Sequence, residues 1–274
     1  MHNKDFEIFD STLEKYIGNK TAVDIPNGIT TIDWYAFQDC SKIQSITIPD
    51  SVTQIGRSAF QDCTNLKNVI LPKCATEIEH SAFMNCRSLQ SIRIPDTVTQ
   101  IYEFTFADCT SLQEIILSDG IAEIGSNTFM NCTNLQSIRI PNTVAEIGDY
   151  AFINCISLKE IVIPNSVTKI GWSAFANCTN LQSLIISNAI IEISQLAFEN
   201  CKSLQEVIVP ESVAEIGFFA FKGCANLQNI IIPNSVTNIS DLAFVDCDKI
   251  VIRSAKNSYA IEYAKEHQIK YEEI

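Results

Sequence analysis

The chain has 274 residues, of which 46% are hydrophobic and 19% charged, and a formal net charge of −13. A chain of this composition has enough apolar residues to form a buried core. Its acidic net charge excludes a function that depends on binding nucleic acid or an anionic membrane through a basic face. No run of 18 apolar residues occurs, so we expect no membrane span. Residues 1–10 lack the apolar segment of a secretory signal. We expect a cytoplasmic protein, or a cell-surface or secreted one if a signal has been removed.

A 23-residue period runs through almost the whole chain. A phenylalanine stands three positions before each cysteine of the series, from Phe37 to Phe244. A fixed period of this length is the signature of a repeat architecture, and it overrides a domain count taken from length. Ten of the eleven cysteines carry the period: Cys40, Cys63, Cys86, Cys109, Cys132, Cys155, Cys178, Cys201, Cys224 and Cys247.

The spacing of apolar residues within one unit predicts a single coil. The unit that begins at Cys132 reads CTNLQSIRIPNTVAEIGDYAF, and its LxxIxI segment alternates inward and outward residues as a strand does. Pro141 then ends the strand, because proline cannot donate to a strand ladder. For the VxxIGxxAF half we expect a short extended stretch, a turn, and about one helical or 3₁₀ turn that carries Ala-Phe. Asp or Asn before nearly every cysteine favours a left-handed corner.

Stacked coils would bury the apolar side chains that one coil leaves open. We therefore predict a repeat solenoid, mainly β, of ten 23-residue coils over residues 25–254. Residues 1–24 form an N-terminal cap and residues 255–274 a C-terminal cap, with a short helix within Ser258 to His267. A glutamine column predicts a ladder of stacked amides between coils: Gln44, Gln90, Gln113, Gln136, Gln182, Gln205 and Gln228.

The unit CxxLxxIxIPxxVxxIGxxAFxx resembles the 23-residue leucine-rich repeat of the BspA-like, Treponema-pallidum-type family. The flanking stretches FEIFDSTLEKYIGNKTAVDIPNGIT and SYAIEYAKEHQIKYEEI also resemble segments of that family. The resemblance implies a curved leucine-rich-repeat horseshoe with parallel β-strands on the concave face. It also implies a protein of host-associated bacteria or protists, often a cell-surface protein that binds host proteins or other cells. The family supplies no catalytic residues.

The cysteines favour packing over chemistry. No CxxC pair occurs, whereas metal sites need clustered ligands. One thiol per coil predicts a ladder of buried, reduced side chains, and we expect no metal and no cofactor. Cys74 lies off the ladder and is expected to be exposed.

The outward strand positions are the candidate partner-binding surface. In the column between the two inward strand residues, the last four members are aliphatic, and side by side they would form an exposed apolar stripe that marks a binding surface. The alternative is plain β-propensity, because Val and Ile favour strands anywhere. The candidate site comprises Arg93, Ile116, Arg139, Glu160, Val162, Ile185, Ile208 and Ile231.

A second candidate surface is aromatic. The pair of positions after Ile-Gly carries both tryptophans, and Trp and Tyr are common interface anchors. The alternative is that these rings pack against neighbouring turns. The candidates are Trp34, Tyr150, Trp172, Phe218 and Phe219.

These features predict a non-enzymatic protein–protein interaction module, expected as a monomer, whose partner could be a host or cell-surface protein. Two alternatives remain open, namely a structural or self-associating scaffold and an intracellular binding protein. An enzyme is disfavoured, because Glu114 and Glu160 stand two coils or about 10 Å apart, farther than the carboxyl pair of a retaining glycosidase.

Overall fold

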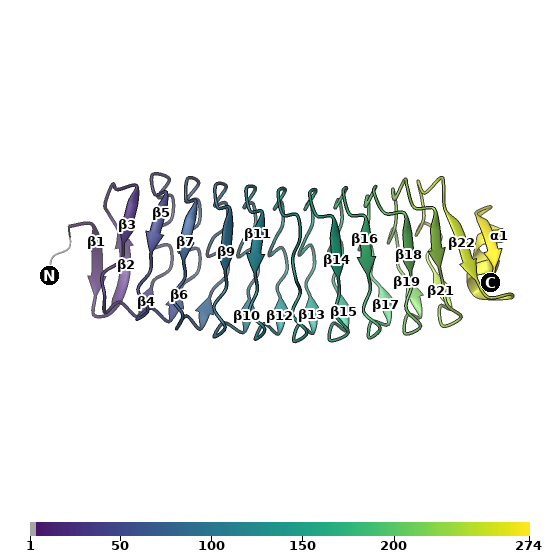
Figure 1. Cartoon of the computed structure of the whole chain (residues 1–274), viewed down its shortest axis with the longest axis horizontal. Helices are drawn as coiled ribbons and strands as arrows, with labels where there is room; N and C mark the ends of the chain where they lie inside the picture. Colours follow the sequence, from purple (N-terminus) through teal and green to yellow (C-terminus); the bar gives the residue numbers. More distant parts are fainter. Residues whose placement is uncertain (1–3) are drawn as a thin grey trace.

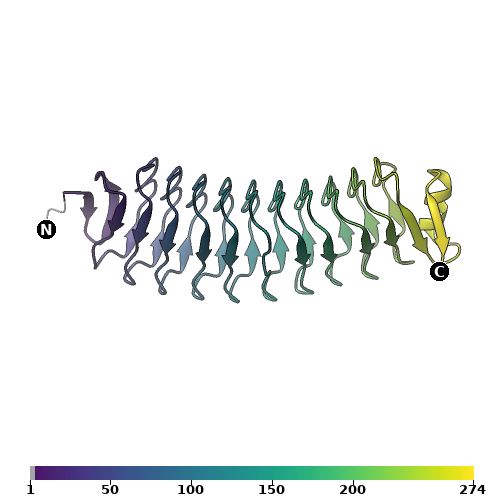
Figure 2. The same cartoon turned by 45° about the horizontal axis from the view of Figure 1, so that its top comes forward.

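A computed structural model describes residues 4–274 as a single row of stacked coils, with the two ends of the chain at opposite ends of the row (Figure 1). The row bends gently (Figure 2). The repeat solenoid expected from the period is confirmed, with about eleven coils and not ten, because residues 22–24 of the expected N-terminal cap already pair in register with the first repeat. Residues 1–3 of the expected N-terminal cap lie outside the described residues.

One side of each coil is a short strand in parallel register with its neighbours, and we call this side the strand face (Figure 1). The central residue of each three-residue strand points inward and the flanking two point outward, as the LxxIxI spacing predicts. The sheet is interrupted between β7 and β9, at residues 137–139, and between β16 and β18. The strands are β3(Ala22–Asp24), β5(Ser45–Thr47), β7(Asn68–Ile70), β9(Ser91–Arg93), β11(Glu114–Ile116), β14(Glu160–Val162), β16(Ser183–Ile185), β18(Glu206–Ile208), β20(Asn229–Ile231), β22(Val251–Ser254) and β23(Lys270–Glu273).

A second row of two-residue strands, which we call the second ladder, forms another side of the coils (Figure 1). Each places an Ile inward, at the Ile of the VxxIG motif. These strands are β4(Thr31–Ile32), β6(Gln54–Ile55), β8(Glu77–Ile78), β10(Gln100–Ile101), β12(Glu123–Ile124), β13(Glu146–Ile147), β15(Lys169–Ile170), β17(Glu192–Ile193), β19(Glu215–Ile216) and β21(Asn238–Ile239).

The third side is a chain of tight turns, and the single turn expected at Ala-Phe is present, closed by a hydrogen bond from the Gln61 N–H to the Ser58 carbonyl at 3.1 Å. Ser58 and Asp62 have φ of 54° and 61°, and a left-handed residue on either side of Ala-Phe prevents a helix from continuing. The N–H groups of Ser58, Phe60 and Asp62 instead donate to carbonyls of the next coil at 2.8–2.9 Å. The left-handed corner expected at the Asp or Asn before cysteine is confirmed. Backbone hydrogen bonds therefore tie the coils together on this side as well.

Phenylalanine rings form the centre of the core. Adjacent rings from Phe37 to Phe244 stack with centroids 5.0–5.8 Å apart and planes within 22° of parallel. Tyr16 of the N-terminal cap stacks on Phe37 at 5.3 Å, and Tyr263 meets Phe244 edge-on at 6.1 Å. Each cap thus continues the aromatic column of the repeats.

The cysteine ladder lies beside the rings. From Cys63 to Cys247, each Sγ donates to the carbonyl of the phenylalanine 26 residues earlier, at 3.0–3.3 Å. Burial raises the pKa of Cys109 and Cys178 to about 12, and removal from water is the largest cause for both thiols. The buried, reduced ladder is confirmed, and Cys74 is exposed as expected.

The caps close both ends of the stack. At the N-terminal end β1(Phe6–Phe9) and β2(Thr12–Tyr16) form an antiparallel hairpin, and β2 continues in parallel with β4. At the other end α1(Tyr259–Glu266) begins after Ser258, whose hydroxyl accepts from the Ile261 N–H. The expected C-terminal helix is confirmed. Within residues 4–274 no helix is long and apolar enough to cross a membrane.

Candidate functional site

The expected partner-binding residues come together on the strand face. Val162, Ile185 and Ile208 lie in adjacent coils with 53%, 56% and 61% of their surfaces exposed. Ile231 continues the column but is half-buried, and Ile116 lies two coils before Val162 and is exposed. An apolar stripe therefore exists, and it is densest from Val162 to Ile208.

A shallow groove runs beside this stripe. Its main part has a volume of about 820 Å³ between the aliphatic column and the turns that follow Pro164 and Pro210. An adjoining recess of about 500 Å³ extends it past Glu160 to Arg139. We call the two parts together the strand-face groove.

The charged members of the candidate site fall into two groups. Arg139 is held by Asp119, with Nη1–Oδ1 and Nη2–Oδ1 distances of 2.7 and 2.5 Å, and Arg93 lies 3.9 Å from Asp96. Glu160, in contrast, makes no ion pair among the described residues and points outward beside the stripe. Each arginine is thus partly neutralised by a neighbouring carboxylate, whereas Glu160 is free to meet a partner.

The aromatic candidates do not form one patch. Trp34 and Trp172 are both exposed, but they lie six coils or about 30 Å apart. Tyr150 belongs to the coil next to Trp172 and is also exposed. Phe218 and Phe219 form a separate pair with ring centroids 3.9 Å apart, and Lys222 Nζ lies 4.7 Å from the Phe219 ring. A contact over all five would need a partner as long as the solenoid.

Ile191 was not identified from the sequence as an exposed apolar residue. Ile191 is 70% exposed and lines a recess of about 360 Å³ on the second ladder together with Trp172. Its column otherwise holds Thr or Ala, such as Thr168 and Ala214. This departure from the column was the available signal.

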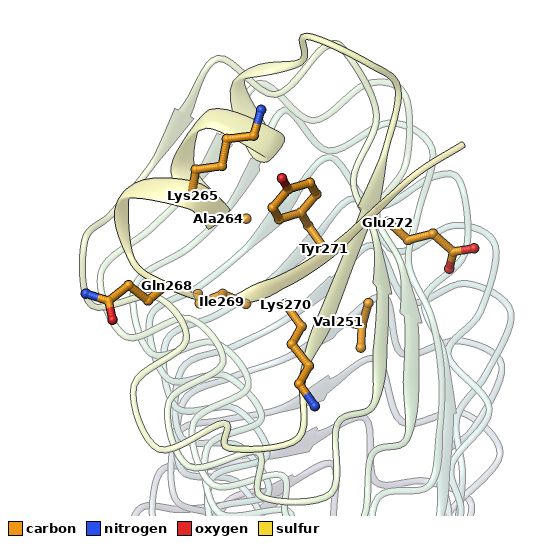
Figure 3. Close-up of a pocket in the computed structure, with 8 residues that line it drawn as sticks. All are labelled: Val251, Ala264, Lys265, Gln268, Ile269, Lys270, Tyr271 and Glu272. Atoms are coloured by element: carbon orange, nitrogen blue, oxygen red, sulfur yellow. The ribbon is translucent and has the colours of Figure 1, made fainter.

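The C-terminal cap carries the other large recess, an open hollow of about 770 Å³ (Figure 3). It lies between α1 and β23, and Figure 3 shows Tyr271 and Lys265 on one side and Lys270 pointing away from them. Lys265 Nζ is 5.4 Å from the centre of the Tyr271 ring, an arrangement that braces β23 against α1. The titratable residues of its lining are Lys265, Lys270, Tyr271 and Glu272.

Metal-binding geometry is also missing from the described part of the chain. Among residues 4–274 no three His, Cys, Asp or Glu side chains lie close enough to hold a metal ion. Thiols are the strongest metal ligands among these side chains, but here they donate hydrogen bonds to phenylalanine carbonyls.

Known proteins share this architecture. A family model described as the BspA type leucine rich repeat region, in six copies, matches residues 8–135 and 122–251. The solved leucine-rich repeat protein of T. pallidum is 32% identical with a TM-score of 0.62, over 66% of this chain and 90% of that chain. A leucine rich cell surface protein of Faecalibacterium prausnitzii is 28% identical over 92% of both chains, with a TM-score of 0.46. No curated protein matches the chain. The matched residues include the whole strand-face groove.

Proposed function

Because the chain belongs to the BspA-type leucine-rich repeat family, we propose that it is a non-enzymatic protein-binding solenoid whose partner docks in the strand-face groove. The observation that carries this proposal is the stripe of Val162, Ile185 and Ile208, each more than half exposed beside a groove of about 820 Å³. Contiguous exposed apolar surface of this kind is a feature of interaction sites.

Strand propensity alone does not account for the stripe. Thr47 in β5 and Arg93 in β9 occupy the same outward column, and both strands form. The fold therefore accepts polar side chains at this position. Three neighbouring exposed aliphatic side chains lower the solubility of the protein. A role in binding a partner explains why they are present.

The test is a four-site variant in which Val162, Ile185, Ile208 and Ile231 become Thr, compared with Ile70→Thr. Ile70 is the matched control, because it is an exposed isoleucine in the same column but far from the groove. A partner isolated with the parent chain should bind the four-site variant more than about 100-fold more weakly, and the control should keep its affinity. Unchanged binding of the four-site variant would discard the groove as the docking site.

The same proposal includes the cell surface as the place of action and a monomer as the active form. Labelling of intact producing cells with a reagent that cannot cross the membrane tests the location. Sedimentation of the purified chain tests the second point, since self-association at micromolar concentration would favour a scaffold instead.

A further inference from the structure

The spacing of the side chains in the aliphatic stripe restricts the shape of any ligand that binds along it. Successive coils are separated by 5.0–5.6 Å at the stacked phenylalanine rings, and parallel strands lie about 4.8 Å apart. The three steps from Val162 to Ile231 therefore cover roughly 14–17 Å. A ligand that fills all four positions must repeat its apolar side chains at the same interval.

The distance between successive turns of an α-helix matches this interval, whereas the distance between same-face residues of an extended chain does not. Three helical turns rise about 16 Å, within the length of the stripe. Same-face residues of an extended strand are about 6.7 Å apart, so the fourth would lie near 20 Å and miss Ile231 by 3 Å or more. Residues i, i+4, i+7 and i+11 of a helix form a single face that follows the column.

The charges beside the stripe add a second condition. On the strand face of these four coils, the charged side chains next to the stripe and in the following turns are Lys159, Glu160, Glu206 and Glu211, so one positive charge against three negative ones leaves −2. None of these four makes an ion pair among the described residues. Arg139, at the edge of the groove, is already held by Asp119. Arg253, which lies next to Ile231 in the neighbouring strand, is held by Glu272 at 2.9 Å. Unpaired carboxylates next to an apolar stripe favour a partner with cationic side chains beside its apolar face.

From this spacing and charge we propose that the partner segment is a basic amphipathic α-helix, seated in the strand-face groove with its axis along the stack of coils. The inference rests on the proposed function of the groove and adds the class of partner. The apolar face of the helix would cover Val162, Ile185 and Ile208, and its lysine or arginine side chains would face Glu160 and Glu206.

Synthetic peptides of about 18 residues, cross-linked on the solvent side to hold a helix, test the proposal. The first carries leucines at i, i+4, i+7 and i+11 flanked by lysines, the second replaces each lysine by glutamate, and the third is a scrambled lysine peptide of equal composition. The fourth is an uncross-linked lysine peptide with leucines at every second position, which suits an extended strand. Fluorescence anisotropy with the full chain measures the affinities at low and high salt.

The lysine helix should bind at least about 10-fold more tightly than each of the other three. Ile185→Thr with Ile208→Thr should weaken it by about 10-fold or more. Glu160→Gln with Glu206→Gln should weaken it several-fold and reduce its salt dependence. The matched control is Glu192→Gln with Glu215→Gln, which removes two exposed acids from the second ladder, and it should leave binding unchanged. Circular dichroism checks that every variant is folded.

Three results would overturn the helix assignment: equal binding of the scrambled peptide, tighter binding of the strand-patterned peptide, or an equal loss with the second-ladder control. If no helix binds while the four-site threonine variant still loses an isolated partner, the partner class is wrong and the docking site stands. If the four-site variant keeps that partner, the docking site itself is wrong.

Discussion

The thiol ladder makes the stability of this protein unusually sensitive to alkali. The pKa is raised in eight cysteines of the ladder, from Cys63 to Cys224, and reaches about 12 for Cys109 and Cys178. Burial is the largest cause in seven of them, whereas a hydrogen bond with Cys247 is the largest cause for Cys224, followed by burial. In the unfolded chain the same thiols titrate near 9.0. Above pH 9 the unfolded chain therefore loses thiol protons that the native protein keeps. The ladder stabilises the fold fully below pH 9, and this stabilisation is lost as the pH rises toward the native pKa.

The size of the effect follows from the number of thiols. At pH 10 each buried thiol lowers the free energy of unfolding by about 1.4 kcal/mol relative to pH 7. The eight together lower it by about 11 kcal/mol, which is comparable to the whole stability of a typical domain. We expect urea unfolding, followed by far-ultraviolet circular dichroism in a reductant, to show a steep fall in stability between pH 9 and pH 10.

A slope measurement separates the thiols from other groups that titrate in this range. The double change of Cys109→Ala and Cys178→Ala should reduce the total fall between pH 7 and pH 10 by about 2.8 kcal/mol, whatever stability the lost packing costs at pH 7. Cys74→Ala is the matched control, because that thiol is exposed in the native protein. An unchanged slope in the double variant would refute the assignment of alkaline sensitivity to the ladder.

Two substitutions test the packing of the core and of the turns. Phe152→Ala should lower the free energy of unfolding, measured with urea, by about 3–5 kcal/mol. The reason is that this buried ring stacks on Phe129 and Phe175 at 5.1 and 5.0 Å. A loss below about 1 kcal/mol would contradict the central role of the stack. Ser166→Thr should raise the stability by about 1 kcal/mol, because the Ser166 hydroxyl is buried without a partner, whereas Thr143 in the same column donates to two carbonyls of the preceding coil. A lower thermal midpoint for this variant would show that the added methyl group does not fit.

Much of the coil could be read from the residues alone. The positions of Phe152 and Cys155 recur every 23 residues. Phe152 stacks on its equivalent Phe175 in the next coil, and its carbonyl accepts a hydrogen bond from Cys178, the equivalent of Cys155. A periodic sequence therefore describes both members of every contact between coils. The C-terminal helix could also be predicted from the sequence, because Ser258 precedes a segment with apolar residues on one face.

Other features could not be read in the same way. The left-handed residues that end the turn at Ala-Phe were not predicted, because residues such as Tyr150, at φ 59°, are of types that do not usually adopt this conformation. The expected amide ladder of glutamines is not formed among the described residues. A hydrogen-bonded ladder runs instead through the asparagines before the cysteines, where Asn154 donates to Asn131 at 2.7 Å and Asn177 to Asn154 at 2.9 Å. Short side chains at a fixed corner reach the next coil, whereas the exposed glutamines are long and have water as a competing partner.

The amino-acid sequence by itself determined the length of the coil and the identity of its inward side chains, because every coil must offer its neighbour the same buried surface. Only the tertiary structure decided which outward residues share a surface. Val162, Ile185 and Ile208 become neighbours beside one groove, whereas Trp34 and Trp172 belong to equivalent positions and remain far apart. Adjacency between outward side chains arises only when the coils are stacked, since it depends on the spacing of the strands and on the turns that frame each face.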